Sequence, residues 1–131
     1  MSSEFSSTSL IMKNLRVLVV DDDADILFLA KLFLESAGCV VMDCLEPKLA
    51  LAALETESVD LLLTDFRMPG SISGLELAHL ATRLHPQLKV IIATGMGPDF
   101  CQEIGAEGFM VLEKPYNRDH LVRTIQTLFA E

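Results

Sequence analysis

The hydrophobic pattern of this chain alternates between two kinds of segment. Short runs that are almost entirely apolar and rich in Val, Leu and Ile are typical of strands buried on both faces. Longer segments, in which apolar residues recur every three or four positions, are typical of amphipathic helices. The expected strands cover 16–20, 39–44, 60–64, 88–93 and 109–112. The expected helices cover 23–37, 47–55, 75–84, 98–104 and the segment from Asn117 onward.

Single residues mark the ends of several expected helices. Gly38 stands just after the first helix, where a C-terminal glycine is common. Pro47 suits the first turn of the second helix. Asp23 and Asn117 stand where a side-chain oxygen can cap a helix N-terminus. These signals support the helices that the hydrophobic pattern predicts.

Five strand–helix repeats predict an α/β fold. Right-handed crossovers place helices on both faces of a parallel sheet, which gives a flavodoxin-like (βα)5 three-layer sandwich. The expected strand order is 2-1-3-4-5, with its switch point between the first and third strands. Ligands of such folds bind in the crevice beyond the carboxyl ends of the strands at that point.

Polar residues close four of the expected strands. Asp21 and Asp22 follow the first strand, and Asp65 follows the third. Thr94 follows the fourth strand, and Lys114 comes shortly after the fifth. Since the carboxyl ends of parallel strands share one edge of the sheet, the three acids predict a pocket for a hard divalent cation. A hydroxyl and an ammonium group beside that pocket indicate a site that handles phosphoryl groups.

Composition and charge narrow the classes of protein. The 131 residues, half of them hydrophobic, suffice for one domain with a substantial core. A net charge of −9 argues against a nucleic-acid-binding surface. No apolar stretch is long enough to span a membrane, and the Ser-rich segment 1–14 does not have the pattern of a signal peptide. Cys39, Cys44 and Cys101 lack metal-ligand spacing, so we expect buried free thiols and a cytoplasmic protein.

Four short motifs occur in order, each at the end of an expected strand. They are Val19-Val20-Asp21-Asp22, Thr64-Asp65-Phe66-Arg67-Met68-Pro69-Gly70, Ala93-Thr94-Gly95 and Lys114-Pro115-Tyr116. Through these motifs the chain resembles the receiver domain of two-component response regulators over roughly residues 15–130. The resemblance predicts a flexible lead-in at 1–14 and a receiver domain at 15–131.

The resemblance implies a magnesium site. Asp22 would be the direct ligand, Asp21 would act largely through water, and Asp65 and the backbone carbonyl of Arg67 would complete the site. Mg²⁺ suits this set because it keeps several waters and takes only one or two protein carboxylates. Three crowded acids repel one another, so one of them should have a raised pKa in the metal-free protein. Asp23 is expected to cap the first helix and not to touch the metal.

The resemblance also implies phosphoryl chemistry. Asp65 would accept a phosphoryl group as an acyl phosphate. The hydroxyl of Thr94 would hydrogen-bond one phosphoryl oxygen, and the ammonium of Lys114 would pair with another. Gly95 would leave access for a partner or phosphodonor. In this family the Lys114-Pro115 bond is often cis.

Two positions depart from the usual receiver pattern. The glycine that normally stands eight residues after the phosphoacceptor is Gly74 here, nine residues after Asp65. That longer loop resembles the C-terminal receivers of hybrid sensor histidine kinases. The aromatic switch position, three residues before the lysine, holds Val111, and Phe109 lies two residues earlier on the same expected strand face. The candidate switch set is therefore Thr94, Phe109 and Val111, with packing in the core favoured for Phe109.

The expected function is that of a phosphoacceptor in a phosphorelay. A sensor histidine kinase or a histidine phosphotransfer domain would be the partner, and the chain would not be an enzyme beyond accepting and slowly losing its own phosphoryl group. It would be a monomer or a weak homodimer through the face formed by helix 98–104, strand 109–112 and the last helix. One alternative is a degenerate receiver that acts only as a docking module. The other is a haloacid dehalogenase-type phosphohydrolase, which would need an acid at the position of Arg67.

Overall fold

The computed structural model describes residues 12–68 and 72–130, and its centre is a five-stranded parallel sheet. The strand order is β2-β1-β3-β4-β5, as the sequence predicts. Each strand is four to six residues long, the usual length for buried strands. The strands are β1 (Arg16–Val20), β2 (Val40–Cys44), β3 (Leu61–Asp65), β4 (Lys89–Thr94) and β5 (Met110–Glu113).

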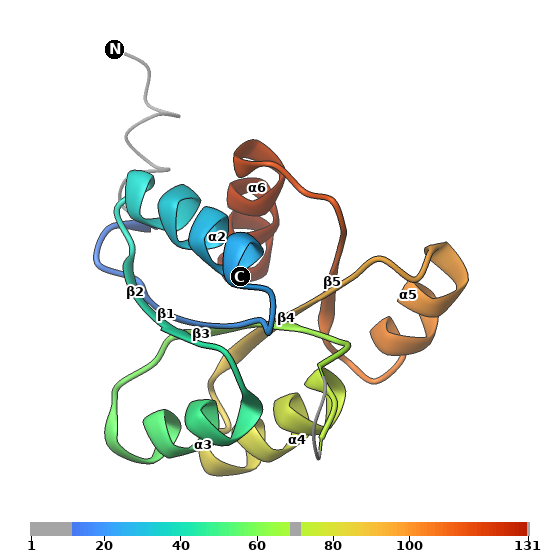
Figure 1. The fold of residues 1–131 in the computed structure, drawn as a ribbon, viewed down its shortest axis with the longest axis horizontal. Coiled ribbons are helices and arrows are strands. Elements are labelled where there is room, and N and C mark those ends of the chain that lie inside the picture. The colour runs from blue at the N-terminus through green and yellow to red at the C-terminus, as the bar shows by residue number, and fades with distance from the viewer. Residues whose placement is uncertain (1–11, 69–71, 131) are drawn as a thin grey trace.

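Helices cover both faces of this sheet (Figure 1). Helices α2 and α6 lie on one face, α3 and α4 lie on the other, and α5 lies beside β5 at the sheet edge. This arrangement is the expected three-layer sandwich. The helices are α2 (Ala24–Ser36), α3 (Pro47–Thr56), α4 (Gly74–Leu84), α5 (Pro98–Gly105) and α6 (Arg118–Phe129).

The sheet divides the hydrophobic core in two, because alternate residues of a strand point to opposite faces. Val17 and Val19 of β1 pack in a cluster with residues of α2 and α6. Leu18 and Val20, which alternate with them along β1, pack in a second cluster with residues of α3 and α4. All four side chains are buried. Burial on both faces explains why these strands read as continuous apolar runs.

Helix starts follow the capping signals in the sequence. The Asp23 side chain accepts hydrogen bonds from the backbone N–H groups at the start of α2, and the Asn117 side chain accepts one from His120 at the start of α6. Ser73 and Glu76 form a reciprocal capping box at the start of α4. Gly38 has φ +103 just after α2, a conformation that favours glycine. The predicted caps at Asp23 and Asn117 are confirmed.

Three strands, β3, β4 and β5, end one residue later than the hydrophobic pattern predicts. Asp65 is the last residue of β3, where it pairs with Ala93 of β4, and Thr94 is the last residue of β4. A polar side chain does not end a strand while its backbone still pairs with a neighbour. Both functional candidates are consequently held by the sheet itself and not by the loops that follow.

The packed part of the described chain begins before the expected domain boundary at residue 15. Met12 is fully buried in the α2–α6 cluster, and the backbone N–H of Asn14 donates to the carbonyl of Gly38 at 2.8 Å. Residues 1–11 of the expected lead-in lie outside the described residues. Among the helices of the described residues, none is long and apolar enough to cross a membrane.

Candidate functional site

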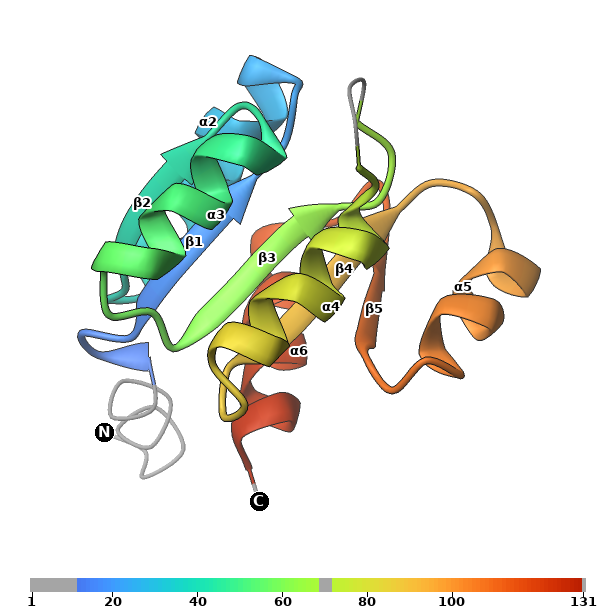
Figure 2. The same cartoon turned by 90° about the horizontal axis from the view of Figure 1, so that it is seen from below.

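Three carboxylates meet where β1 and β3 end side by side (Figure 2). One carboxylate oxygen from each of Asp21, Asp22 and Asp65 lies within 4.8 Å of the other two. Asp21 and Asp65 are buried, whereas Asp22 is exposed. This is a hard-oxygen donor set with one side open to water, and its chemistry fits Mg²⁺.

The ammonium group of Lys114, just after the end of β5, also lies beside the acids. Its Nζ lies 2.8 Å from Asp65 Oδ1 and 3.1 Å from Asp21 Oδ2. Its backbone N–H donates to the carbonyl of Thr94 at 2.8 Å, which carries the β4–β5 pairing one residue past Glu113. Lys114 therefore reaches the acids from a position fixed by the backbone, and the bond to Pro115 that follows is cis.

The charges of this cluster shift the pKa values of its members. Burial raises the pKa of Asp65, and the negative charges of Asp21 and Asp22 raise it further, while contact with Lys114 lowers it; the net shift is upward. Burial lowers the pKa of Lys114, but its contacts with Asp65 and Asp21 outweigh burial and raise the pKa overall. The crowding of the three carboxylates predicts an acid with a raised pKa; the pKa of Asp65 is raised, but burial is its main cause and the neighbouring acids add less.

Thr94 and Arg67 lie at the mouth of the same site. Together with the acids and Lys114 they line a cavity of about 360 Å³. The Thr94 hydroxyl, which is buried, accepts a hydrogen bond from the backbone N–H of Met96 at 3.2 Å. The Arg67 side chain is exposed and its Nη2 lies 3.4 Å from Met96 Sδ. Among the described residues, a methyl group at Gly95 would meet only Lys114 Cβ, at 3.8 Å, so these residues leave the entrance beside Thr94 open.

Gly74 supports the site by a close contact between backbones. A Cβ atom at this position would overlap the carbonyl of Asp65 and lie 2.9 Å from Phe66 Cα. Its N–H donates to the Phe66 carbonyl at 2.8 Å. The additional residue between Asp65 and Gly74 therefore leaves the glycine in contact with the acceptor strand. The spacing flagged this position, but only the structure shows the contact; Pro69, Gly70 and Ser71 of the same loop lie outside the described residues.

The candidate switch residues Val111, on β5, and Phe109, just before it, lie at different distances from Thr94. Thr94 pairs with Glu113, and Ile92 pairs with Val111. Phe109 precedes the strand and stands four positions before Glu113, or about 13 Å along the sheet at ~3.3 Å per residue. Phe109 and Val111 both pack, half-buried, against the α3–α4 cluster, so they share a face as expected.

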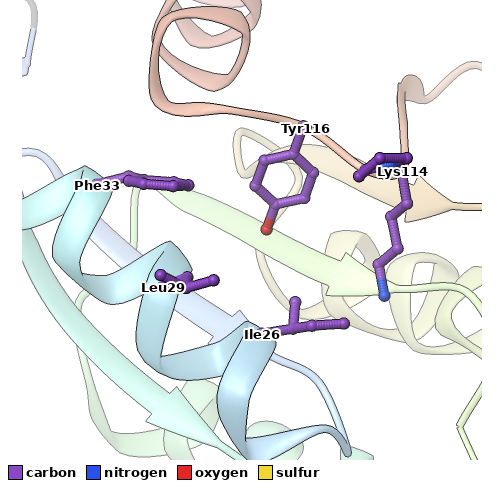
Figure 3. Close-up of a pocket in the computed structure, with 6 residues that line it drawn as sticks. Ile26, Leu29, Phe33, Lys114 and Tyr116 are labelled. Atoms are coloured by element: carbon purple, nitrogen blue, oxygen red, sulfur yellow. The ribbon is translucent and has the colours of Figure 1, made fainter.

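An apolar cavity of about 350 Å³ adjoins the site between α2 and the segment after β5. Figure 3 shows the ring of Tyr116 facing Ile26, Leu29 and Phe33 of α2, with the Lys114 side chain beside it. Burial, together with the charges of Asp21 and Asp65, raises the pKa of Tyr116 to about 12. Its hydroxyl therefore stays protonated at neutral pH. The motif contains this tyrosine, but no sequence signal places it in a cavity.

The histidines and cysteines lie away from the carboxylates. His79 contacts Glu107, His85 Nε2 lies 2.6 Å from the Leu54 carbonyl, and His120 is exposed on α6. All three cysteines are free; Cys39 is buried as expected, whereas the other two are only partly buried.

Comparison with known proteins identifies the family. The model of the response regulator receiver domain matches residues 17–126. The chain belongs to the response regulator receiver family. It is therefore a receiver domain of two-component systems, a class of signalling modules that interact with histidine kinases and bind Mg²⁺ at an acidic pocket. The haloacid dehalogenase alternative is thereby overturned.

Individual relatives agree with this assignment. The chain is 37% identical over 119 residues to the response regulator receiver protein CpdR of Brucella abortus, covering 86% of this chain and 95% of CpdR. It is 34% identical over 110 residues to the C4-dicarboxylate transport transcriptional regulatory protein DctD of Rhizobium meliloti, covering 82% of this chain but only 24% of DctD.

A solved structure shows the same fold. The response regulator TrrA from Thermotoga maritima superposes with a TM-score of 0.78 at 29% identity, over 87% of this chain and 98% of TrrA.

Proposed function

We propose that this receiver accepts a phosphoryl group on Asp65 from a phosphohistidine of a sensor histidine kinase or a histidine phosphotransfer domain. One observation carries the proposal: a buried carboxylate, 2.8 Å from the Lys114 ammonium, lies beside two further acids at the open edge of the sheet. This arrangement pairs a nucleophile with a positive charge and a cation site, which phosphoryl transfer needs.

The transfer is a displacement at phosphorus. An oxygen of Asp65 bonds to phosphorus while the bond between phosphorus and the donor imidazole nitrogen breaks. The electron pair stays on that nitrogen, which takes up a proton from solvent, and Asp65 becomes an acyl phosphate. Lys114 and the Thr94 hydroxyl stabilise the charge on the phosphoryl oxygens. Attack by water then slowly returns the carboxylate and inorganic phosphate, and no other reaction is proposed.

The two acids after β1 would take different parts in holding Mg²⁺. Both oxygens of Asp21 already have partners, since Oδ1 accepts from the Asp23 N–H at 2.9 Å and Oδ2 contacts Lys114. Asp22 is exposed and makes no hydrogen bond or ion pair with the described residues. These contacts favour Asp22 as direct ligand and Asp21 as a ligand through water, with Asp65 and the Arg67 backbone carbonyl completing the site.

One of the similar solved structures contains both a bound ion and a mimic of the phosphoryl group. TrrA was solved in complex with Mg²⁺ and beryllium fluoride, which supports the same pair of ligands for this chain. When bound, Mg²⁺ supplies positive charge that offsets the charge of the phosphoryl oxygens.

Phosphorylation would change the binding of partners at the face formed by α5, β5 and α6, which we call the response face. Thr94 links the site to β4, and β4 pairs directly with β5. The acyl phosphate would shift an equilibrium between two arrangements of this face. The acidic net charge favours protein partners over nucleic acid, and the chain would be a monomer or a weak homodimer through the response face.

Labelling by a small phosphodonor tests the proposal. The intact mass of the protein after acetyl phosphate treatment should show one added phosphoryl group with Mg²⁺ and none with EDTA. Asp65→Asn should remove the label, whereas Asp43→Asn, an exposed strand residue on β2, should keep it. Full labelling of Asp65→Asn would place the acceptor elsewhere. An unlabelled but folded wild-type protein that still binds a kinase would favour the docking-module alternative.

A further inference from the structure

His79 of α4 contacts two neighbouring positions just before β5. Its Nε2 lies 3.1 Å from Glu107 Oε1. Its ring meets the ring of Phe109 edge to face, with centroids 5.1 Å apart and planes at 69°. Gly108, between the two, has φ +98, a conformation that favours glycine and lets the chain turn there. One imidazole thus ties the connection from α5 to β5 onto α4.

The chemistry of the pair fixes how the imidazole binds. An ionised carboxylate can only accept, so the contact with Glu107 requires a proton on Nε2 whether the ring is neutral or charged. A hydrogen bond to an ionised carboxylate is charge-assisted, which makes it shorter and stronger than one between neutral groups. The rings of His79 and Phe109 have the edge-to-face arrangement that aromatic pairs prefer. His79 therefore holds the residues on both sides of Gly108.

Glu107 is the only described residue that forms an ion pair with His79. The strand residues that pack against this side of the sheet are apolar, as the α3–α4 cluster shows. The remaining charged side chains on the neighbouring helices are Glu76 and Arg83 on α4, Lys48 and Glu55 on α3, and Asp99 and Glu103 on α5. Glu76 is already engaged in the capping box of α4.

We propose that His79 is a positioning residue for the response face: it holds Phe109 and the segment before β5 against α4. With this contact in place, the response face rearranges less readily than it would without it. This regulatory role rests on the proposed function, because it matters only if the response face moves on phosphorylation.

Amide hydrogen exchange of the unphosphorylated protein tests the hold by itself. His79→Gln keeps a donor for Glu107 but loses the ring, so the backbone amides of residues 107–111 should exchange faster than in the wild type. In His79→Ala, which loses both contacts, they should exchange faster still. In His120→Gln, a change at an exposed histidine on α6, the exchange of these amides should remain as in the wild type. Unchanged exchange in His79→Ala would overturn the inference.

Beryllium fluoride tests the link to function. Loss of an aromatic contact of this kind should let the β5 amide signals respond at a roughly three- to tenfold lower beryllium fluoride concentration in His79→Gln than in the wild type, with Mg²⁺ present. Identical responses of the two proteins would overturn the regulatory role. A wild-type protein that shows no response at all would instead refute phosphoryl acceptance on Asp65, and hydrogen exchange would still decide whether His79 holds the segment.

Discussion

Gly74→Ala adds a single methyl group where α4 begins against the end of β3. The methyl would overlap the carbonyl of Asp65 and press on Phe66 Cα. Asp65 pairs with Ala93 of β4 and the Phe66 N–H donates to the Ala93 carbonyl, so these backbone atoms cannot move aside as a flexible side chain would. Over-packing typically costs about 1–3 kcal/mol, and the rigid neighbours favour the upper half of that range. The higher helix propensity of alanine returns at most ~1 kcal/mol.

The net loss should be about 1–2 kcal/mol, which lowers the melting temperature of a domain of this size by roughly 4–8 °C. Gly105→Ala is the matched control, because a methyl group there meets no atom of the described residues within 4 Å. It should leave the melting temperature unchanged or raise it slightly. Thermal unfolding followed by circular dichroism measures both variants, and acetyl phosphate labelling should slow in Gly74→Ala because the Asp65 backbone shifts. A Gly74→Ala melting temperature within about 1 °C of the wild type would refute the reasoning.

Three further outcomes are expected. Asp22→Ala should weaken Mg²⁺ binding, measured by calorimetry, far more than Asp23→Ala, because the Asp23 side chain caps α2; equal losses would contradict the assignment. Burial and neighbouring acids raise the pKa of Asp65 in the folded protein. The stability that this residue contributes is therefore fully present below the ordinary Asp pKa of about 3.9, and it is lost as pH rises through the raised pKa. Metal-free Asp65→Asn should therefore melt higher than the wild type at neutral pH, by a margin that narrows on acidification, and a lower melting temperature would reverse this sign. Phe109→Ala should cost about 1.5–2.5 kcal/mol, half the cost for a fully buried ring, because this ring is half-buried; an unchanged melting temperature would show that it contributes no packing.

The sequence was sufficient for the layers of the fold and for the place where the acids meet. Strands buried on both faces leave continuous apolar runs, and the parallel topology brings their carboxyl ends to one edge. Asp21 and Asp65 could therefore be placed together from the sequence alone. The pattern could not place the last residue of a strand, because Asp65 and Thr94 stay in the sheet through backbone pairing that side-chain polarity does not reveal.

Contacts between distant side chains were beyond sequence reasoning. The longer connection before β5 moves Phe109 four register positions from the partner of Thr94, and its ring then meets His79 of α4. A histidine on a helix carries no sequence signal for such a contact. The apolar cavity beside Tyr116 likewise depends on how α2 packs against the segment after β5.

The division of the core by the sheet bears on how substitutions combine. Leu34 and Ile125 belong to the cluster under α2 and α6, whereas Leu54 and Leu77 belong to the cluster under α3 and α4. Because strand backbones separate the two sets, truncations on opposite faces should have additive effects on unfolding free energy, within about 0.3–0.5 kcal/mol. Truncations within one cluster share neighbours and should couple. Each face can thus vary in sequence with little effect on the other.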